Sequence, residues 1–159
     1  MEIYLLRHAI AEENSPSGRD ADRRLTEKGC DKLRRVLKRA AVAEVEPSLI
    51  LTSPLVRAVQ TAEIAAQVLK YKGKILQNEA LLPGSSPRDV WDELRNHKDE
   101  TAVLLAGHEP LFSITTAFLL GSTRQMVDFK KAGLVRIDVT SLGPSPAGIL
   151  KWLITPDVA

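Results

Sequence analysis

The sequence has few of the residues on which several protein classes depend. One cysteine, Cys30, occurs in 159 residues, so no internal disulfide can form and a reducing cytoplasm is the expected location. No apolar run approaches the roughly 20 residues of a membrane span. No basic segment precedes the apolar start, so no signal peptide is expected. Aromatic residues make up 4% and the net charge is only +2, which disfavours nucleic-acid binding.

Motifs for two common hydrolase chemistries are also missing. No glycine-rich loop of the form G-x-x-x-x-G-K-[ST] occurs, which disfavours an NTPase. The three histidines, His8, His97 and His108, show no H-x-H or H-x-x-x-H spacing, which disfavours a metallohydrolase. We therefore expect no metal and no cofactor, and an activity that survives a chelator.

The chain does contain a regular alternation of apolar runs and amphipathic segments. The runs predict strands over residues 2–7, 48–52, 74–77, 101–106, 134–139 and 149–154. The amphipathic segments predict helices over residues 26–41, 53–69, 86–97 and 111–120. Thr26 and Ser53 are the expected N-caps of the first two helices, and Cys30 lies on the apolar stripe of the first. No helix separates the last two strands, which predicts a hairpin or two edge strands.

This alternation predicts an α/β fold with one domain over residues 1–159. The expected architecture is a three-layer α/β/α sandwich with a mostly parallel central sheet. Such sheets bind ligands beyond the carboxyl ends of their strands. Residues at those ends are therefore the first candidates for a functional site.

Basic and imidazole side chains occur at three such ends. Arg7 and His8 end the first predicted strand, Arg57 falls in the first turn after the second, and His108 follows the fourth. Guanidinium groups offer paired donors that match phosphate oxygens. A neutral imidazole is a competent nucleophile toward phosphorus when an acceptor holds its other nitrogen. The four residues therefore predict a phosphoryl-transfer site. His97, at a predicted helix end, is expected to be structural.

These residues belong to motifs that resemble those of a known family. The histidine phosphatase superfamily has similar sequences to Arg-His at 7–8, SPLVRAVQTA at 53–62 and Gly-His at 107–108. The segments DRRLTEKG at 22–29 and LLPG at 81–84 make the chain most similar to the SixA-type phosphohistidine phosphatases of that superfamily. The resemblance runs from about residue 1 to residue 155.

The resemblance implies a role for each matching residue. His8 is the nucleophile that becomes transiently phosphorylated, and Arg7 and Arg57 bind the phosphoryl oxygens. His108 stabilises the transition state. Arg23 matches a further arginine that reaches the substrate.

Three positions leave alternatives open. Arg24, next to Arg23, is an equally placed candidate for that phosphate contact. Ala9 stands where the superfamily most often has glycine. Glu79 lies roughly where larger members carry an acid that protonates an alcohol leaving group, a role that an imidazole leaving group does not need.

The implied function is a metal-independent phosphatase that hydrolyses phosphohistidine on a protein, such as a phosphotransfer domain of a signalling relay. The chain has few insertions, which predicts an open active site. The protein is expected to be a monomer in the cytoplasm. The same-class alternative is a phosphatase for small phosphate esters, and a sugar-phosphate mutase would need a clearer acidic motif. The alternative from another class is a non-catalytic phosphate-binding module.

Overall fold

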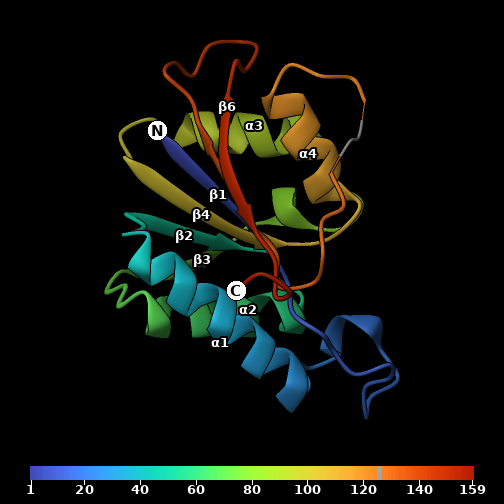
Figure 1. Cartoon of the computed structure of the whole chain (residues 1–159). Helices are drawn as coiled ribbons and strands as arrows, with labels where there is room; N and C mark the ends of the chain where they lie inside the picture. The colour runs from blue at the N-terminus through green and yellow to red at the C-terminus, as the bar shows by residue number, and fades with distance from the viewer. Residues whose placement is uncertain (125–126) are drawn as a thin grey trace.

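Helices cover both faces of one six-stranded sheet in a computed structural model, which describes residues 1–124 and 127–159 (Figure 1). The strands are β1 (Glu2–Arg7), β2 (Leu49–Thr52), β3 (Ile75–Gln77), β4 (Ala102–Gly107), β5 (Leu134–Asp138) and β6 (Ile149–Ile154). The helices are α1 (Glu27–Val42), α2 (Val56–Val68), α3 (Pro87–Asn96) and α4 (Leu111–Leu119), with 3-10 turns η1 (Asp20–Asp22) and η2 (Glu79–Leu81). No helix of the described residues is long and apolar enough to cross a bilayer.

The sheet is mostly parallel, as the alternating sequence pattern predicts. Its strand order is β3-β2-β4-β1-β5-β6, and β3, β2, β4 and β1 all run in the same direction. β5 lies antiparallel to β1, and β6 lies antiparallel to β5 at the edge. The predicted hairpin at the end of the chain is therefore confirmed.

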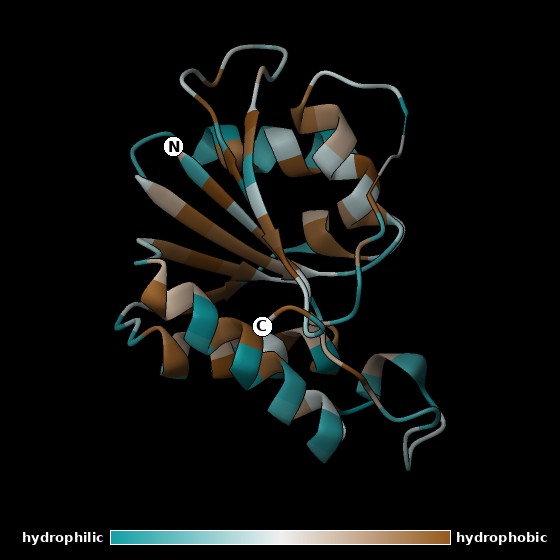
Figure 2. Cartoon of the chain, viewed as in Figure 1, coloured by the Kyte–Doolittle hydropathy of each residue, from teal (hydrophilic) through white to brown (hydrophobic). Residues whose placement is uncertain are grey.

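The alternating side chains of β1 build two apolar layers, one on each face. Ile3 and Leu5 pack with residues of α3 and α4, including Trp91 and Phe112. Tyr4 and Leu6 pack on the other face, in the cluster that holds the inner side of α1 and α2. Figure 2 shows the hydrophobic strands between helices whose outer residues are hydrophilic, most clearly along α1. The predicted three-layer α/β/α architecture is confirmed.

The start of α1 follows the sequence prediction, except for the residue that enters the core. Thr26 is the N-cap, and its hydroxyl accepts a hydrogen bond from the Gly29 amide at 3.0 Å. Gly29 is buried against the backbone of Ile10, whereas Cys30, expected to be a core residue, is only half-buried. The absence of a side chain at Gly29 is what lets the loop after β1 lie directly on the helix.

The prediction that Ser53 caps α2 is wrong. The helix begins at Val56, and Leu55 holds the N-cap position without a side-chain cap. The Ser53 hydroxyl instead accepts a 3.3 Å hydrogen bond from the Leu55 amide, so it stabilises an extended turn before the helix. This turn leaves the hydroxyl at the carboxyl end of β2.

Gly29→Ala tests the close contact between α1 and the loop after β1. A Cβ atom at Gly29 would lie 2.9 Å from the Ile10 nitrogen and nearer still to its carbonyl oxygen. Alanine has the higher helix propensity, but we expect the free energy of unfolding to fall by about 1–3 kcal/mol in urea denaturation. Gly84→Ala is the control, because a Cβ there meets nothing within 4 Å. A Gly29→Ala protein as stable as the wild type would show that the contact relaxes freely.

Candidate active site

Strand pairing brings the two candidate histidines together. In the parallel pair of β1 and β4, Arg7 is opposite Gly107, so His8 and His108 leave the sheet side by side. The His8 amide donates to the Gly107 carbonyl at 2.9 Å. The two imidazole centroids are 5.1 Å apart, with the rings tilted by 59°. Both histidines therefore lie at the carboxyl edge of the sheet, as their positions at strand ends predict.

The His8 ring is fixed by its own main chain. Its Nδ1 lies 2.8 Å from the Ala9 carbonyl oxygen, which can only accept, so Nδ1 carries the proton of the neutral ring. Burial lowers the pKa of His8 to about 4, and the positive charges of Arg57, Arg7 and Lys131 lower it in the same direction. At neutral pH the ring is uncharged, and its Nε2 holds an unshared electron pair.

His108 is the more deeply buried imidazole, with only 2% of its surface exposed. Its Nε2 lies 2.7 Å from the Ser53 hydroxyl, although the sequence predicts a helix cap for Ser53. Burial lowers the pKa of His108 to about 3, helped by His8 and Arg57. Its Nδ1 is buried and has no hydrogen-bond partner among the described residues. A buried polar atom left without a partner is costly, so this nitrogen is a candidate contact for a bound group.

Two guanidinium groups accompany the histidines. Arg57, in the first turn of α2, is 6% exposed, and Arg7 ends β1. Arg7 donates from one terminal nitrogen to the Phe129 carbonyl at 2.6 Å. The Nε atoms of both arginines are buried and have no partner in the described part of the chain. Both arginines therefore hold unused donors beside two neutral imidazoles, a combination suited to an anion.

The residues after Arg57 fix the surrounding loops. Gln60 accepts a hydrogen bond from the Leu25 amide at 2.8 Å, which holds the segment before α1. Thr61 accepts from the Ala9 amide at 3.3 Å and so supports the loop that carries His8. One turn of α2 therefore orients the candidate arginine and both loops beside it.

Sequence reasoning missed Asp20, which links two arginines. Its carboxylate lies 3.1 Å from Arg57 and 2.9 Å from Arg23, and its carbonyl accepts from Arg57 at 3.0 Å. These bonds lower the pKa of Asp20, and the hydrogen bond from Arg23 makes the largest contribution. The sequence signal was an acid three residues before Arg23, which gives an i,i+3 pair on one helical turn.

The link through Asp20 distinguishes Arg23 from Arg24. The Arg23 guanidinium joins the cluster through Asp20 and also donates to the Glu12 carbonyl at 2.6 Å, whereas the Arg24 side chain is exposed. The loop that carries Asp20 is closed at its base, because the Glu12 amide donates to the Arg24 carbonyl at 2.8 Å.

Two other residues singled out in the sequence form no hydrogen bond or ion pair with the described residues of this cluster. Glu79 is exposed in η2, after the edge strand β3, and its carboxylate forms no hydrogen bond or ion pair with any described residue. His97 ends α3, and its Nε2 lies 2.8 Å from a Glu93 carboxylate oxygen, in agreement with a structural role.

The side chains of the cluster are a poor match for a metal ion. No group of three potential His, Cys, Asp or Glu ligands occurs in the described ranges 1–124 and 127–159. Two arginines beside the imidazoles would also repel a cation.

The carboxyl edge of this α/β sheet brings two histidines and two arginines together. The chain belongs to the histidine phosphatase superfamily, whose branch 1 family model matches residues 3–81. It is similar to the phosphohistidine phosphatase SixA of Escherichia coli K12, with 28% identity over 159 residues, covering 98% of this chain and 94% of that protein. An uncharacterized protein of Picosynechococcus sp. is 33% identical over 142 residues, covering 85% and 83% of the two chains. The solved structure of a protein histidine phosphatase SixA complexed with tungstate has a TM-score of 0.88 at 26% identity, covering 99% and 98% of the two chains.

Stability against pH tests whether the histidines are buried in the neutral form. Their pKa values fall from 6.5 to about 4 and about 3 on folding, so the unfolded chain binds more protons between these values. We therefore expect the free energy of unfolding, measured in urea, to have its full value above pH 6.5 and to decrease as the pH falls toward 4. His8→Asn should reduce this slope. An equal slope in both proteins would mean that His8 binds a proton as readily folded as unfolded.

Proposed function

We propose that this protein is a metal-independent phosphatase that removes the phosphoryl group from phosphohistidine on another protein, with His8 as the nucleophile. The observation that carries the proposal is the state of the His8 ring. The ring is neutral, its Nδ1 is held by the Ala9 carbonyl, and two arginines with unused donors lie beside it. An activated imidazole beside fixed cations meets the main demands of phosphoryl transfer.

The reaction has two displacements at phosphorus. In the first, the His8 Nε2 electron pair forms a bond to phosphorus while the bond from phosphorus to the substrate imidazole breaks. Arg7 and Arg57 neutralise the charge on the non-bridging oxygens. In the second, water attacks the phosphorylated His8, inorganic phosphate leaves, and His8 regains its electron pair. The proton released by water passes to the phosphate product or to solvent.

The leaving group explains why a strong general acid is dispensable. Phosphohistidine protonated on its other ring nitrogen releases a neutral imidazole, whereas a phosphate ester releases an alkoxide that must be protonated. The exposed position of Glu79, without a side-chain partner among the described residues, fits a reaction that does not need this acid.

His108 acts as a hydrogen-bond donor to the phosphoryl group in this proposal. When the Ser53 hydroxyl donates to His108 Nε2, the neutral ring carries its proton on Nδ1. That Nδ1 is the buried atom without a partner in the described residues, and we assign its N–H to a phosphoryl oxygen. Ser53 would then be a positioning residue that selects the tautomer.

Similarity to known proteins supports phosphohistidine as the group that is hydrolysed. The Escherichia coli relative is named a phosphohistidine phosphatase, and it aligns over 98% of this chain. We propose that the partner is a phosphotransfer domain of a signalling relay. This protein would act on it as a monomer in the cytoplasm. Arg23, linked to Arg57 through Asp20, is a further candidate for contact with the phosphoryl group.

The experiment compares two substrates in the presence of a chelator. We expect fast release of phosphate from a phosphohistidine-bearing domain and slow turnover of p-nitrophenyl phosphate. Efficient ester cleavage without activity on the domain would instead favour a small-molecule phosphatase, with Glu79 as the next residue to test. Loss of activity in chelator, restored by a divalent metal, would contradict the mechanism.

His8→Ala should reduce turnover of either substrate by at least about 1000-fold, because it removes the nucleophile. The variant should keep its fold, since His8 follows the last residue of β1 and belongs to neither apolar cluster. Circular dichroism and thermal unfolding check this point. An unfolded His8→Ala protein would assign a structural role to the residue, and unchanged activity would exclude it as the nucleophile.

Ser53→Ala should lower kcat by about 10-fold with little change in KM, because His108 loses the partner that selects its tautomer. Ser48→Ala is the matched control. Ser48 lies just before the first residue of β2, and its hydroxyl donates to the Ala102 carbonyl instead. A Ser53→Ala enzyme with wild-type kcat would show that the hydroxyl does not position the ring.

A further inference from the structure

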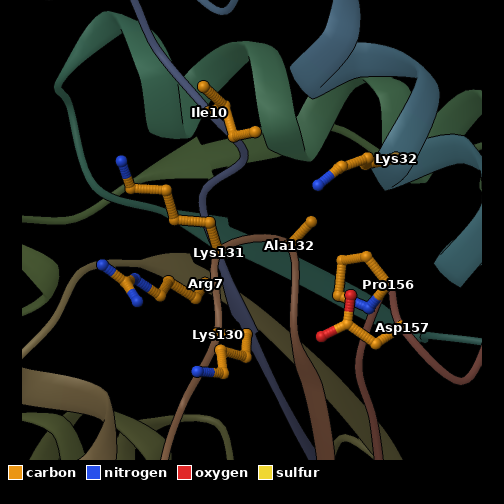
Figure 3. A pocket seen from close by; sticks show the side chains of 8 residues that line it. All are labelled: Arg7, Ile10, Lys32, Lys130, Lys131, Ala132, Pro156 and Asp157. Carbon is orange, nitrogen blue, oxygen red and sulfur yellow. The ribbon is translucent and has the colours of Figure 1, made fainter.

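A hollow of about 270 Å³ lies beside Arg7, at the margin of the candidate site (Figure 3). Its charged lining consists of Arg7, Lys32, Lys130 and Lys131 against a single carboxylate, Asp157. These cations come from β1, from α1 and from the segment before β5, which are far apart in the sequence. We call this feature the lysine hollow.

Part of this positive charge is not paired with a neighbouring carboxylate. Lys130 pairs with Asp128 at 2.7 Å. Lys32 and Lys131 form no ion pair with any residue in the described ranges, and Lys131 is exposed. Uncompensated lysines gathered in one concave surface raise the local potential and attract anionic groups.

The lysine hollow adjoins the candidate active site through Arg7. Arg7 lines the hollow and also belongs to the cluster around His8. The lysine segment is fixed against His8, because the Ala132 amide donates to the His8 carbonyl at 3.2 Å. Lys131 also contributes to the lowered pKa of His8, which reflects its proximity to that ring. A ligand that places a phosphoryl group at His8 would therefore reach over these lysines.

We propose that the lysine hollow binds Asp and Glu side chains that surround the phosphohistidine on the protein substrate. This inference rests on the proposed function and assigns the chemistry of the partner surface. The enzyme would recognise the acidic surroundings of the target histidine as well as the phosphoryl group. Acidic side chains in these positions would steer the partner toward His8 and increase the association rate.

The geometry of the lysine hollow favours protein carboxylates over a second phosphate group. In Figure 3 the ammonium groups of Lys32, Lys130 and Lys131 are spread over the hollow and do not converge on one point. Ile10, Ala132 and Pro156 complete the lining with apolar surface. Separate point charges with apolar surface between them match carboxylates on short aliphatic stems. A phosphate group is more often held by converging donors from arginines or a helix N-terminus.

Lys32→Glu tests the proposal without altering a residue that contacts His8. The substrates are a purified phosphotransfer domain with Asp and Glu beside its phosphorylated histidine, and free phosphohistidine. We expect kcat/KM for the domain to fall about 10-fold at low salt, with a weaker salt dependence than in the wild type. The loss for free phosphohistidine should be at least about 5-fold smaller. Replacing the acids of the domain by Asn and Gln should remove the difference between wild type and variant.

Lys98→Glu is the matched control, because it makes the same charge change on an exposed lysine after α3, outside the lysine hollow. Lys98→Glu should leave kcat/KM unchanged for both substrates. Equal losses on both substrates in Lys32→Glu, or no loss on the domain, would overturn the proposal. It is also overturned if Lys32→Glu weakens inhibition by inorganic pyrophosphate as strongly as it weakens turnover of the domain, since the hollow would then hold a second phosphate.

Binding of the unphosphorylated domain separates this proposal from the proposed function. If the wild type hydrolyses no phosphohistidine, the proposed function fails, but the dissociation constant of the acidic domain still tests the lysine hollow. Weaker binding to Lys32→Glu than to wild type would support the hollow as a docking surface. Equal binding would exclude it.

Discussion

The register of β1 against β4 is the constraint on which the candidate site depends. Arg7 is opposite Gly107 in this parallel pair, and His8 and His108 are the next residues of the two strands. A shift by one residue would move one histidine by about 3.3 Å and turn its side chain to the other face. The register is fixed by burial of β1 on both faces, where Ile3 and Leu5 enter one apolar cluster and Tyr4 and Leu6 the other.

Burial at this edge then determines the chemical state of the side chains. Two imidazoles beside two guanidinium groups can be buried together only if the imidazoles stay neutral, and their lowered pKa values agree with this. Arg57 keeps a counter-charge in Asp20, whose carboxylate remains largely exposed at 65%. A phosphoryl dianion can therefore take the place of the Asp20 carboxylate as the negatively charged partner of Arg57.

The sequence predicts the sheet and the convergence of Arg7, His8, Arg57 and His108 well, because apolar runs define strands and their carboxyl ends share an edge. The Ser53 prediction failed because Ser-Pro is compatible both with a helix cap and with an extended turn, and contact with His108 selects the turn. Asp20 was missed because its partner Arg57 is 37 residues away. The lysine hollow was missed for the same reason, since only the folded chain brings Lys32 to Lys131.

The loop that carries Asp20 is closed at its base by the hydrogen bond from Glu12 to Arg24. With its two stems joined, the middle of the loop, around Gly18, can gain or lose residues without shifting either β1 or α1. Because the cost of closing a longer loop grows only slowly with its length, insertions there are inexpensive in stability. A change in the length of this one segment therefore leaves the strand ends that bear the histidines in place.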